Sequence, residues 1–251
     1  MTGINVARHG HVGWVTIERP HVRNALDLAA RMALIDAFAA LDADRDVRVA
    51  VLTGAGGAFC AGTDLSGEQP SDHPLVQRPQ RLAAPLDAFS KPVIAAIDGA
   101  AAGGGFELAL AADLRVASPS AKFLLPEVRI GSLPGSGGTQ RIFRALPSAV
   151  AWKTLLTGLP LTAEEAERHG LVSEVVPHDR FHDEVARLAE RVAEGAPLSL
   201  AAAKRAGRAA VDSVEGMELE RELWARLAGT HDRAEGRAAF REKRPPRYEG
   251  R

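Results

Sequence analysis

Three consecutive glycines followed closely by a carboxylate are the residues best suited to chemistry in this sequence. Residues 103–105 are glycine, and Glu107 follows after Phe106. Glycines let a backbone approach a ligand closely, and the unpaired N–H groups of a helix's first turn carry the positive end of the helix dipole. Such a segment is suited to holding negative charge on an oxygen atom. A plain tight turn that needs glycine only for its φ angles would leave the same pattern.

The five residues after Glu107 are all apolar, which predicts that its side chain is buried. A buried carboxylate is costly unless it is paired, hydrogen-bonded or functional. Burial would also raise its pKa toward the range useful for general acid or base catalysis. The alternative is a carboxylate that merely favours a helix N-terminus.

A second carboxylate, Glu127, follows the apolar residues 123–126, where Pro126 fixes the backbone just before it. Taken alone, Glu127 is typical of a solvated loop glutamate. Its interest comes from the pair, because two carboxylates beside one anion site allow one to activate water while the other transfers a substrate proton.

The elements that must position these residues alternate between strand and helix. Apolar strands are expected over residues 48–53, which lead into the glycine-rich turn 54–57, and over residues 91–97, just before the glycine cluster. The helix that carries Glu107 is followed by a further strand over residues 114–117. This alternation predicts an α/β architecture.

The rest of the chain follows patterns of the same kind, and it contains no internal repeat of fixed period. The expected elements are a strand over 12–18 that ends at Pro20, a helix over 27–43 capped by Asp27, an irregular proline-rich stretch over 67–85, helices within 140–157, a helix begun by a capping box of Thr162 and Glu165 and ended near Gly170, and a strand over 171–176. From residue 181 onward the pattern is helical, with a break at Gly195 and Pro197. Two units follow: a core over residues 1–195 that carries the site, and a C-terminal helical region over 196–251.

Composition narrows the functional classes. The 251 residues carry a net charge of −1, so no basic field attracts nucleic acid or anionic lipid. The apolar stretch 93–114 is interrupted by Asp98, Glu107 and Asp113, which predicts a buried strand and helix rather than a membrane span. A single cysteine, Cys60, and no apolar run typical of a signal peptide at the start predict a cytoplasmic protein without disulfides.

Competing kinds of site are weaker. The glycine pairs lack the last glycine of a dinucleotide fingerprint, and neither a phosphate-binding loop nor a nucleophile elbow is present. His178 and His182 lie one helical turn apart but have no evident third metal ligand. Cys60 lies among apolar residues, which indicates packing rather than nucleophilic chemistry. We therefore expect neither a metal nor a redox cofactor.

Six segments, in order along almost the whole chain, resemble the crotonase superfamily, also called the enoyl-CoA hydratase/isomerase family. They are Arg19-Pro20 with Asn24-Ala25-Leu26, residues 58–65, residues 103–107, Pro126-Glu127, residues 134–141, and late in the chain Glu235-Gly236 with Ala239-Phe240 and residues 242–244. No single segment is specific, but six in the family order are.

The resemblance implies an α/β spiral of ββα units whose C-terminal helical region, residues 196–251, forms trimers, commonly paired into hexamers. It implies that the backbone N–H groups of Ala61 and Gly104 form an oxyanion hole for an acyl thioester. It further implies that Glu107 and Glu127 are the catalytic pair of a hydratase. The substrate-binding residues that it implies are Ala25, Ala61, Gly62, Thr63, Asp64, Leu65, Gly103 and Gly104.

The implied reaction adds water to a trans-2-enoyl-CoA, with Glu107 activating the water and Glu127 protonating Cα. Coenzyme A arrives as part of the substrate, and no separate cofactor is expected. Isomerase, decarboxylase or hydrolase chemistry on the same oxyanion hole, and an acyl-CoA-binding protein without catalysis, are the alternatives. Phe106 and Thr63 depart from the residues common in family hydratases, and the stretch 67–85, where the family builds its acyl pocket, gives no indication of acyl-chain length.

Overall fold

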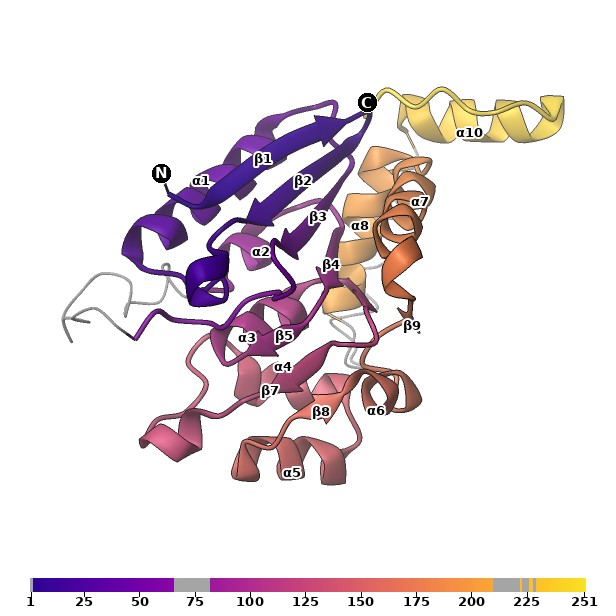
Figure 1. Ribbon diagram of the computed structural model, residues 1–251. Coiled ribbons are helices and arrows are strands. Elements are labelled where there is room, and N and C mark those ends of the chain that lie inside the picture. The colour runs from indigo at the N-terminus through magenta and orange to yellow at the C-terminus, as the bar shows by residue number, and fades with distance from the viewer. Residues whose placement is uncertain (1, 66–81, 210–221, 223–225, 228) are drawn as a thin grey trace.

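A parallel sheet, extended by one antiparallel edge strand, forms the centre of the molecule (Figure 1). The computed structural model describes residues 2–65, 82–209, 222, 226–227 and 229–251. The strands, in spatial order, are β1 (Ile4–His9), β2 (Val12–Ile17), β3 (Val49–Gly54), β4 (Val93–Ile97), β6 (Leu114–Ala117) and β9 (Glu174–Val175). Only β1 runs antiparallel to its neighbour.

A second, smaller sheet explains how the chain turns from strand to helix. Its strands are β5 (Ala100–Ala102), β7 (Lys122–Leu124) and β8 (Leu161–Thr162). Each of β4 and β6 in the main sheet is followed by a short strand in the second sheet and then by a helix, namely α3 (Gly104–Ala111) after β5 and α4 (Gly138–Ala145) after β7. Together with β1, β2 and α1 (Leu28–Ala43), these are repeated ββα units, so the predicted α/β spiral is confirmed.

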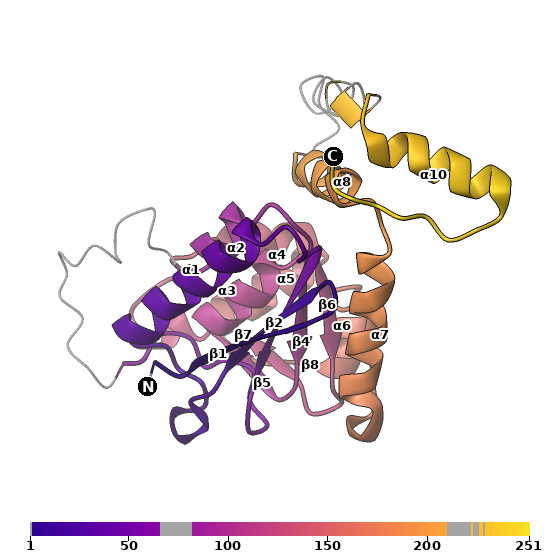
Figure 2. The same ribbon diagram turned by 90° about the horizontal axis from the view of Figure 1, so that it is seen from above.

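The central strands of the main sheet, β2, β3 and β4, are largely buried on both faces, as expected for parallel strands covered by helices. Along β3, Ala50 and Leu52 face the core shared with α1 and α3, whereas Val49 and Val51 face the core shared with α7 (Phe181–Ala193). All four are fully buried. Figure 2 shows α1 and α3 on one side of the sheet and α7 on the other.

Helix starts follow local sequence signals. The Asp27 carboxylate accepts a hydrogen bond from the Ala30 N–H at 2.8 Å, which confirms it as the N-cap of α1. The Thr162 and Glu165 capping box is also present, at the start of α6 (Ala163–Arg168). Further helices are α2 (Ala84–Ala88) and α5 (Ser148–Thr157). Residues 66–81 lie outside the described residues, so the expectation for 67–85 is tested only from residue 82, just before α2.

The predicted strand over 171–176 is shorter than expected, since only Glu174–Val175 pairs with β6. Four strands were not predicted: β1, β5, β7 and β8. Strands β5 and β7 have three residues each and β8 has two, too few to show a period of two. Every residue of β1 except Ile4 is exposed, so β1 lacks the buried apolar face of a half-buried strand.

The C-terminal helices lie to one side of the sheets. The predicted break is confirmed, because α7 ends at Ala193 and α8 (Pro197–Arg208) begins at a proline. Helix α10 (His231–Glu242) is remote from the sheets, and the last residues fold back along it (Figure 2). The N–H groups of Glu249 and Gly250 donate to the Asp232 carboxylate at 2.7 and 2.9 Å.

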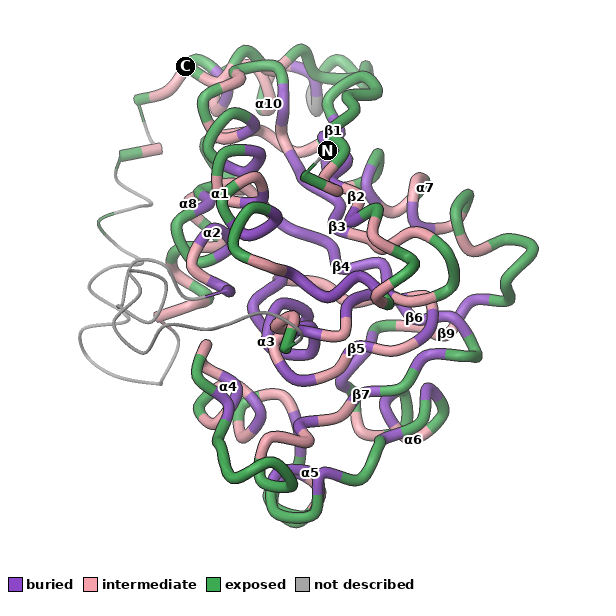
Figure 3. The backbone as a smooth tube through the Cα atoms, turned by 60° about the vertical axis from the view of Figure 1, so that its left-hand side comes forward, coloured by how far each residue is buried: buried purple, intermediate pink, exposed green. Residues whose placement is uncertain are grey.

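The most buried residues lie in the middle of this arrangement. Figure 3 shows the central strands and α3 buried, whereas the outer turns of α5 and α10 are exposed. In the described part of the chain, no helix has both the length and the apolar character needed to cross a bilayer.

Candidate active site

The start of α3 is held against the segment that follows β3. An added Cβ at Gly105 would lie only 1.9 Å from the Cys60 carbonyl oxygen, and an added Cβ at Gly62 would lie 2.7 Å from the Gly104 nitrogen. Gly62 and Gly103 also adopt positive φ angles of 87° and 52°. The glycines are therefore required by close backbone approach as well as by turn geometry. This brings residues 60–64 beside the N-terminus of α3.

Backbone hydrogen bonds decide which N–H groups of this segment remain available. The Asp64 N–H donates to Leu26 and the Leu26 N–H donates to Gly62, so the chain between them turns the Thr63 N–H the other way. An added Cβ at Gly104 would lie 3.7 Å from the Thr63 nitrogen. Among the described residues, neither the Thr63 N–H nor the Gly104 N–H donates a hydrogen bond to the backbone.

The expectation for Ala61 is contradicted by this geometry. The Ala61 N–H donates to the Arg23 carbonyl oxygen at 3.0 Å and is thereby engaged in the fold. An oxyanion would have to displace that bond, whereas the Thr63 N–H lies beside Gly104 without one. The two-donor site implied by the resemblance is therefore better matched by Thr63 and Gly104.

Glu107 is buried, as predicted, with 3% of its surface exposed. Its Oε1 accepts hydrogen bonds from the N–H groups of Ser136 and Gly138, at 2.6 and 2.8 Å. Ser136 lies in the turn before α4 and Gly138 is the first residue of α4, so the carboxylate joins α3 to a second element instead of capping its own helix. Two amide donors fix the orientation of a carboxylate more firmly than solvent does.

Glu127 also lies near the start of α3, and it begins a 3₁₀ helix, Glu127–Ile130. Its Oε1 would be 3.2 Å from an added Cβ at Gly103. Within the described residues its Oε2 is buried and has no hydrogen-bond partner. Burial raises the pKa of Glu127 to about 6; the Glu107 charge adds to this effect, and a backbone hydrogen bond opposes it.

The two predicted carboxylates are thus brought together at one helix start in different environments. Glu107 is held by amides, and Glu127 is partly desolvated with a pKa near neutrality. A carboxyl group of that kind can both give and accept a proton near pH 7. The two N–H groups beside them can hold an oxygen that gains negative charge.

The other predicted binding residues surround this point. Ala25 is buried next to Leu26, which pairs with Thr63, and Asp64 lies 3.3 Å from an Arg19 guanidinium nitrogen. Leu65 is the most exposed of the set, at 68%.

Cys60, the first residue of the segment 60–64, is fully buried, and burial raises the pKa of its thiol to about 12. A thiol with that pKa is a packing group and not a nucleophile. Within the described ranges, no cluster of three His, Cys, Asp or Glu side chains is arranged to bind a metal ion.

Sequence reasoning missed the partners of Glu107. Residues 134–141 counted only as part of the resemblance, with no role for Ser136 or Gly138. It also missed Leu82, whose Cδ2 would lie 2.5 Å from an added Cβ at Gly104. Glycines at 135, 137 and 138 were the available signal, since glycine exposes backbone N–H groups to a neighbour.

Comparisons with known proteins by sequence and by structure give matches over almost the whole chain. The sequence model described as Enoyl-CoA hydratase/isomerase matches residues 7–251. The chain is 45% identical to the (E)-benzylidenesuccinyl-CoA hydratase of Thauera aromatica over 96% of each chain, and 42% identical to the 2,3-dehydroadipyl-CoA hydratase of Escherichia coli (strain K12) over the full length of both. Among solved structures, an enoyl-CoA hydratase from Bacillus anthracis is similar to this chain, with a TM-score of 0.94 at 35% sequence identity. The match covers 99% of this chain and 100% of the Bacillus anthracis chain.

Proposed function

This chain belongs to the enoyl-CoA hydratase/isomerase family of enzymes, and on that basis we propose that it adds water across the double bond of a trans-2-enoyl-CoA to give a 3-hydroxyacyl-CoA. One observation carries the proposal: Glu107 and Glu127 flank the same glycine-lined helix start. Hydration needs two proton-transfer groups around one enolate, and this site holds two carboxylates.

In the proposed mechanism, the thioester carbonyl oxygen binds between the N–H groups of Gly104 and Thr63. As water adds to Cβ, electrons shift toward this oxygen and an enolate forms. Fixed N–H donors stabilise the charged enolate more than the neutral carbonyl, so they lower the barrier rather than only tighten binding. Glycines at 62, 103 and 105 allow the backbone approach that brings the donors together.

The two glutamates divide the proton transfers. Glu107, oriented by the Ser136 and Gly138 amides, positions the water and takes its proton as the oxygen bonds to Cβ. Glu127, whose pKa is raised to about 6, gives its proton to Cα as the enolate collapses. One water is added in total, and exchange with solvent returns the proton from Glu107 to Glu127.

A second candidate reaction is the migration of a double bond within an enoyl-CoA. It uses the same enolate but needs only a group that takes a proton from one carbon and returns it to another. The raised pKa of Glu127 suits that task. The fixed position of Glu107 has no role in such a shuttle, which favours hydration.

We further propose that the enzyme uses no cofactor beyond the coenzyme A of its substrate and acts in the cytoplasm, where its lone buried Cys60 stays reduced. The C-terminal helices of residues 196–251 are proposed to form trimers or pairs of trimers. Light scattering on the purified protein measures that assembly directly. A monomer would contradict it.

The proposed reaction is tested by following the loss of enoyl absorbance when the purified protein meets crotonyl-CoA, a longer trans-2-enoyl-CoA and 2,3-dehydroadipyl-CoA. The last substrate is chosen because a relative that is 42% identical is named for it. Glu127→Gln tests the site, and Glu165→Gln, at a partly exposed glutamate of the α6 capping box, is the matched control.

We expect rapid hydration of at least one thioester, lost with Glu127→Gln and kept with Glu165→Gln. Hydration by neither the wild type nor the control, with a 3-enoyl-CoA converted instead, would contradict hydratase function in favour of isomerisation.

A further inference from the structure

Arg141, on α4, holds the turn that carries the two amide donors to Glu107. Its Nη1 donates to the Ser136 carbonyl oxygen at 2.7 Å, while the Ser136 N–H donates to Glu107 at 2.6 Å. The guanidinium lies over Gly137, where an added Cβ would be 2.2 Å from Nη1. Arg141 and Glu107 therefore bind opposite sides of the same short turn.

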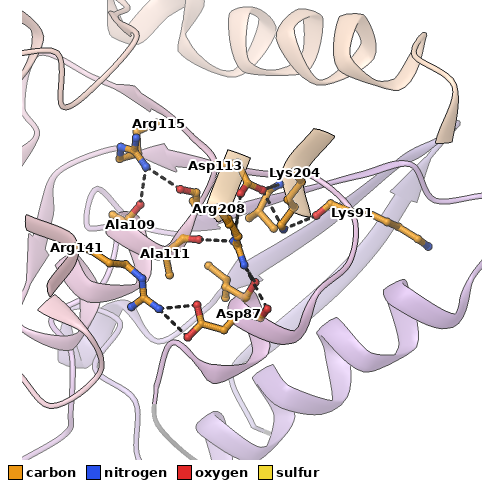
Figure 4. Close-up of polar contacts among 12 residues, drawn as sticks. Asp87, Lys91, Ala109, Ala111, Asp113, Arg115, Arg141, Lys204 and Arg208 are labelled. Carbon is orange, nitrogen blue, oxygen red and sulfur yellow. Dashed lines mark hydrogen bonds and ion pairs between the residues drawn. The ribbon is translucent and has the colours of Figure 1, made fainter. Parts of the chain in front are cut away.

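The other edge of the guanidinium binds Asp87, the acidic residue of α2. Nη2 of Arg141 donates to both carboxylate oxygens of Asp87, at 2.5 and 2.7 Å (Figure 4). The same segment has a second link to the turn, because the Leu82 N–H donates to the Ser136 hydroxyl at 3.1 Å. Leu82 is also the side chain that lies over Gly104.

Helix α8 fixes this segment from the far side. Nη1 of Arg208 donates to the carbonyl oxygens of Leu86 and Asp87, each at 3.2 Å, and Nη2 donates to Ala111 at the end of α3, at 2.9 Å. Arg208 and Lys204 share the Asp113 carboxylate (Figure 4). A continuous set of polar contacts thus runs from α8 through α2 and Arg141 to the turn that binds Glu107.

We propose that Arg141, oriented by Asp87, is a positioning residue for Glu107. The inference rests on the proposed function, since it assigns Arg141 a task in placing a group for hydration. A turn with glycines at 135, 137 and 138 has little conformational preference of its own, so an external group must select the conformation that aims both amides at Glu107. Arg141 is placed to do so.

An ordinary surface ion pair is the competing explanation, and it predicts a different outcome. The side chains of Arg141 and Asp87 are 25% and 47% exposed, so their pairing should add little to stability. Misplacement of a catalytic group by about 1 Å, in contrast, can cost about 100-fold in rate. A positioning role therefore lowers kcat strongly while thermal stability changes little.

The test compares Arg141→Gln with Arg144→Gln, an exposed arginine on the same helix with the same loss of charge. We expect Arg141→Gln to lower kcat about 10- to 100-fold with KM within about threefold, because a displaced Glu107 affects the reaction more than substrate binding. Arg144→Gln should stay within twofold of wild type. Arg141→Lys should give an intermediate kcat, since one ammonium cannot reproduce the two-edged contact with Asp87 and Ser136.

A double variant separates action through Glu107 from general damage. In a Glu107→Gln background, Arg141→Gln should cause no further loss in kcat, because the group that it positions is already gone. A full additional loss in that background would overturn the proposal. So would a single Arg141→Gln variant within twofold of wild type.

Hydrogen exchange of the peptide spanning residues 134–138, read by mass spectrometry, keeps this inference separate from the proposed reaction. Arg141→Gln should speed exchange of this peptide at least tenfold relative to Arg144→Gln, since the Ser136 and Gly138 amides lose their fixed acceptor. Faster exchange without any hydration by wild type would support the positioning role and contradict only the proposed reaction. Unchanged exchange would overturn the positioning role whatever the reaction is.

Discussion

Glu107 and Glu127 both lie near the start of α3, but their surroundings differ. Glu107 accepts two backbone hydrogen bonds, which fix it to the turn before α4 and to the first residue of α4. Glu127 has a buried oxygen without a partner among the described residues and a pKa raised to about 6. The hydrogen bonds hold Glu107 in a fixed position, whereas the raised pKa allows Glu127 to change its protonation state. The difference fits the proposed division, in which Glu107 activates water and Glu127 protonates Cα.

Replacing either glutamate should have the largest effect. Glu107→Gln and Glu127→Gln should each lower kcat for hydration by about 10²–10⁴-fold, the usual contribution of a positioned acid or base. Steady-state kinetics with the best thioester measures both losses. Less than a tenfold loss in either variant would remove that residue from the mechanism.

The pH dependence should distinguish the two carboxylates next. In the proposed mechanism Glu127 must be protonated so that it can donate a proton to Cα. The value of kcat/KM for hydration should therefore fall as pH rises above about 6, and the fall should approach tenfold per pH unit. A pH–rate profile of the wild-type enzyme measures this fall. A kcat/KM that stays constant from pH 5 to 8 would show that Glu127 is not the proton donor.

A substitution at the start of α4 should displace Glu107. An added Cβ at Gly138 would lie 3.0 Å from both Cγ and Oε1 of Glu107 and 2.9 Å from Cβ of Pro134, whereas one at Gly135 would meet nothing within 4 Å. Gly138→Ala should therefore lower kcat about tenfold through a displaced carboxylate, and Gly135→Ala should leave it within twofold. Equal kcat values for the two variants would mean that the turn does not position Glu107.

Replacing Glu127 and replacing Glu107 should change the thermal stability in opposite directions. The folded-state pKa of Glu127 is raised above 4.5, so the folded protein binds more protons between pH 4.5 and 6 and loses stability as pH rises through that window. Glu127→Gln removes this penalty and should raise the Tm above pH 6 by about 2–4 °C, allowing for screening at a half-buried site.

Glu107→Gln should instead lower the Tm, because it weakens two hydrogen bonds to a charged acceptor. Scanning calorimetry at pH 4.5 and 7.5 measures both changes. A Tm that falls in Glu127→Gln at pH 7.5 would contradict the desolvation described for that carboxylate.

The sequence indicated the chemistry of α3 better than it indicated the surroundings of α3. Five apolar residues after Glu107 were enough to predict its burial, since a helix that is apolar all round is a buried helix. Glu127 gained significance only from its partner. The amides of Ser136 and Gly138 are backbone groups, so the nearby glycines could indicate exposed N–H groups but could not identify Glu107 as their acceptor.

The backbone also explains why the N–H group of Thr63, and not that of Ala61, faces α3. In a regular extended segment, the N–H groups of residues two apart point the same way. Gly62 adopts a positive φ of 87°, which breaks that alternation, so Ala61 and Asp64 face the neighbouring chain while Thr63 faces α3. A sequence motif identifies the segment, but the backbone conformation determines which N–H group faces the site.

The most direct test of the division between the two carboxylates uses a thioester that cannot be hydrated. In deuterated water, wild-type enzyme should exchange the α-protons of butyryl-CoA, because enolate formation needs only Glu127 and the two N–H donors. Proton NMR or mass spectrometry follows this exchange. The division predicts that Glu107→Gln keeps the exchange and Glu127→Gln loses it. Exchange that survives Glu127→Gln but disappears with Glu107→Gln would reverse the assignment.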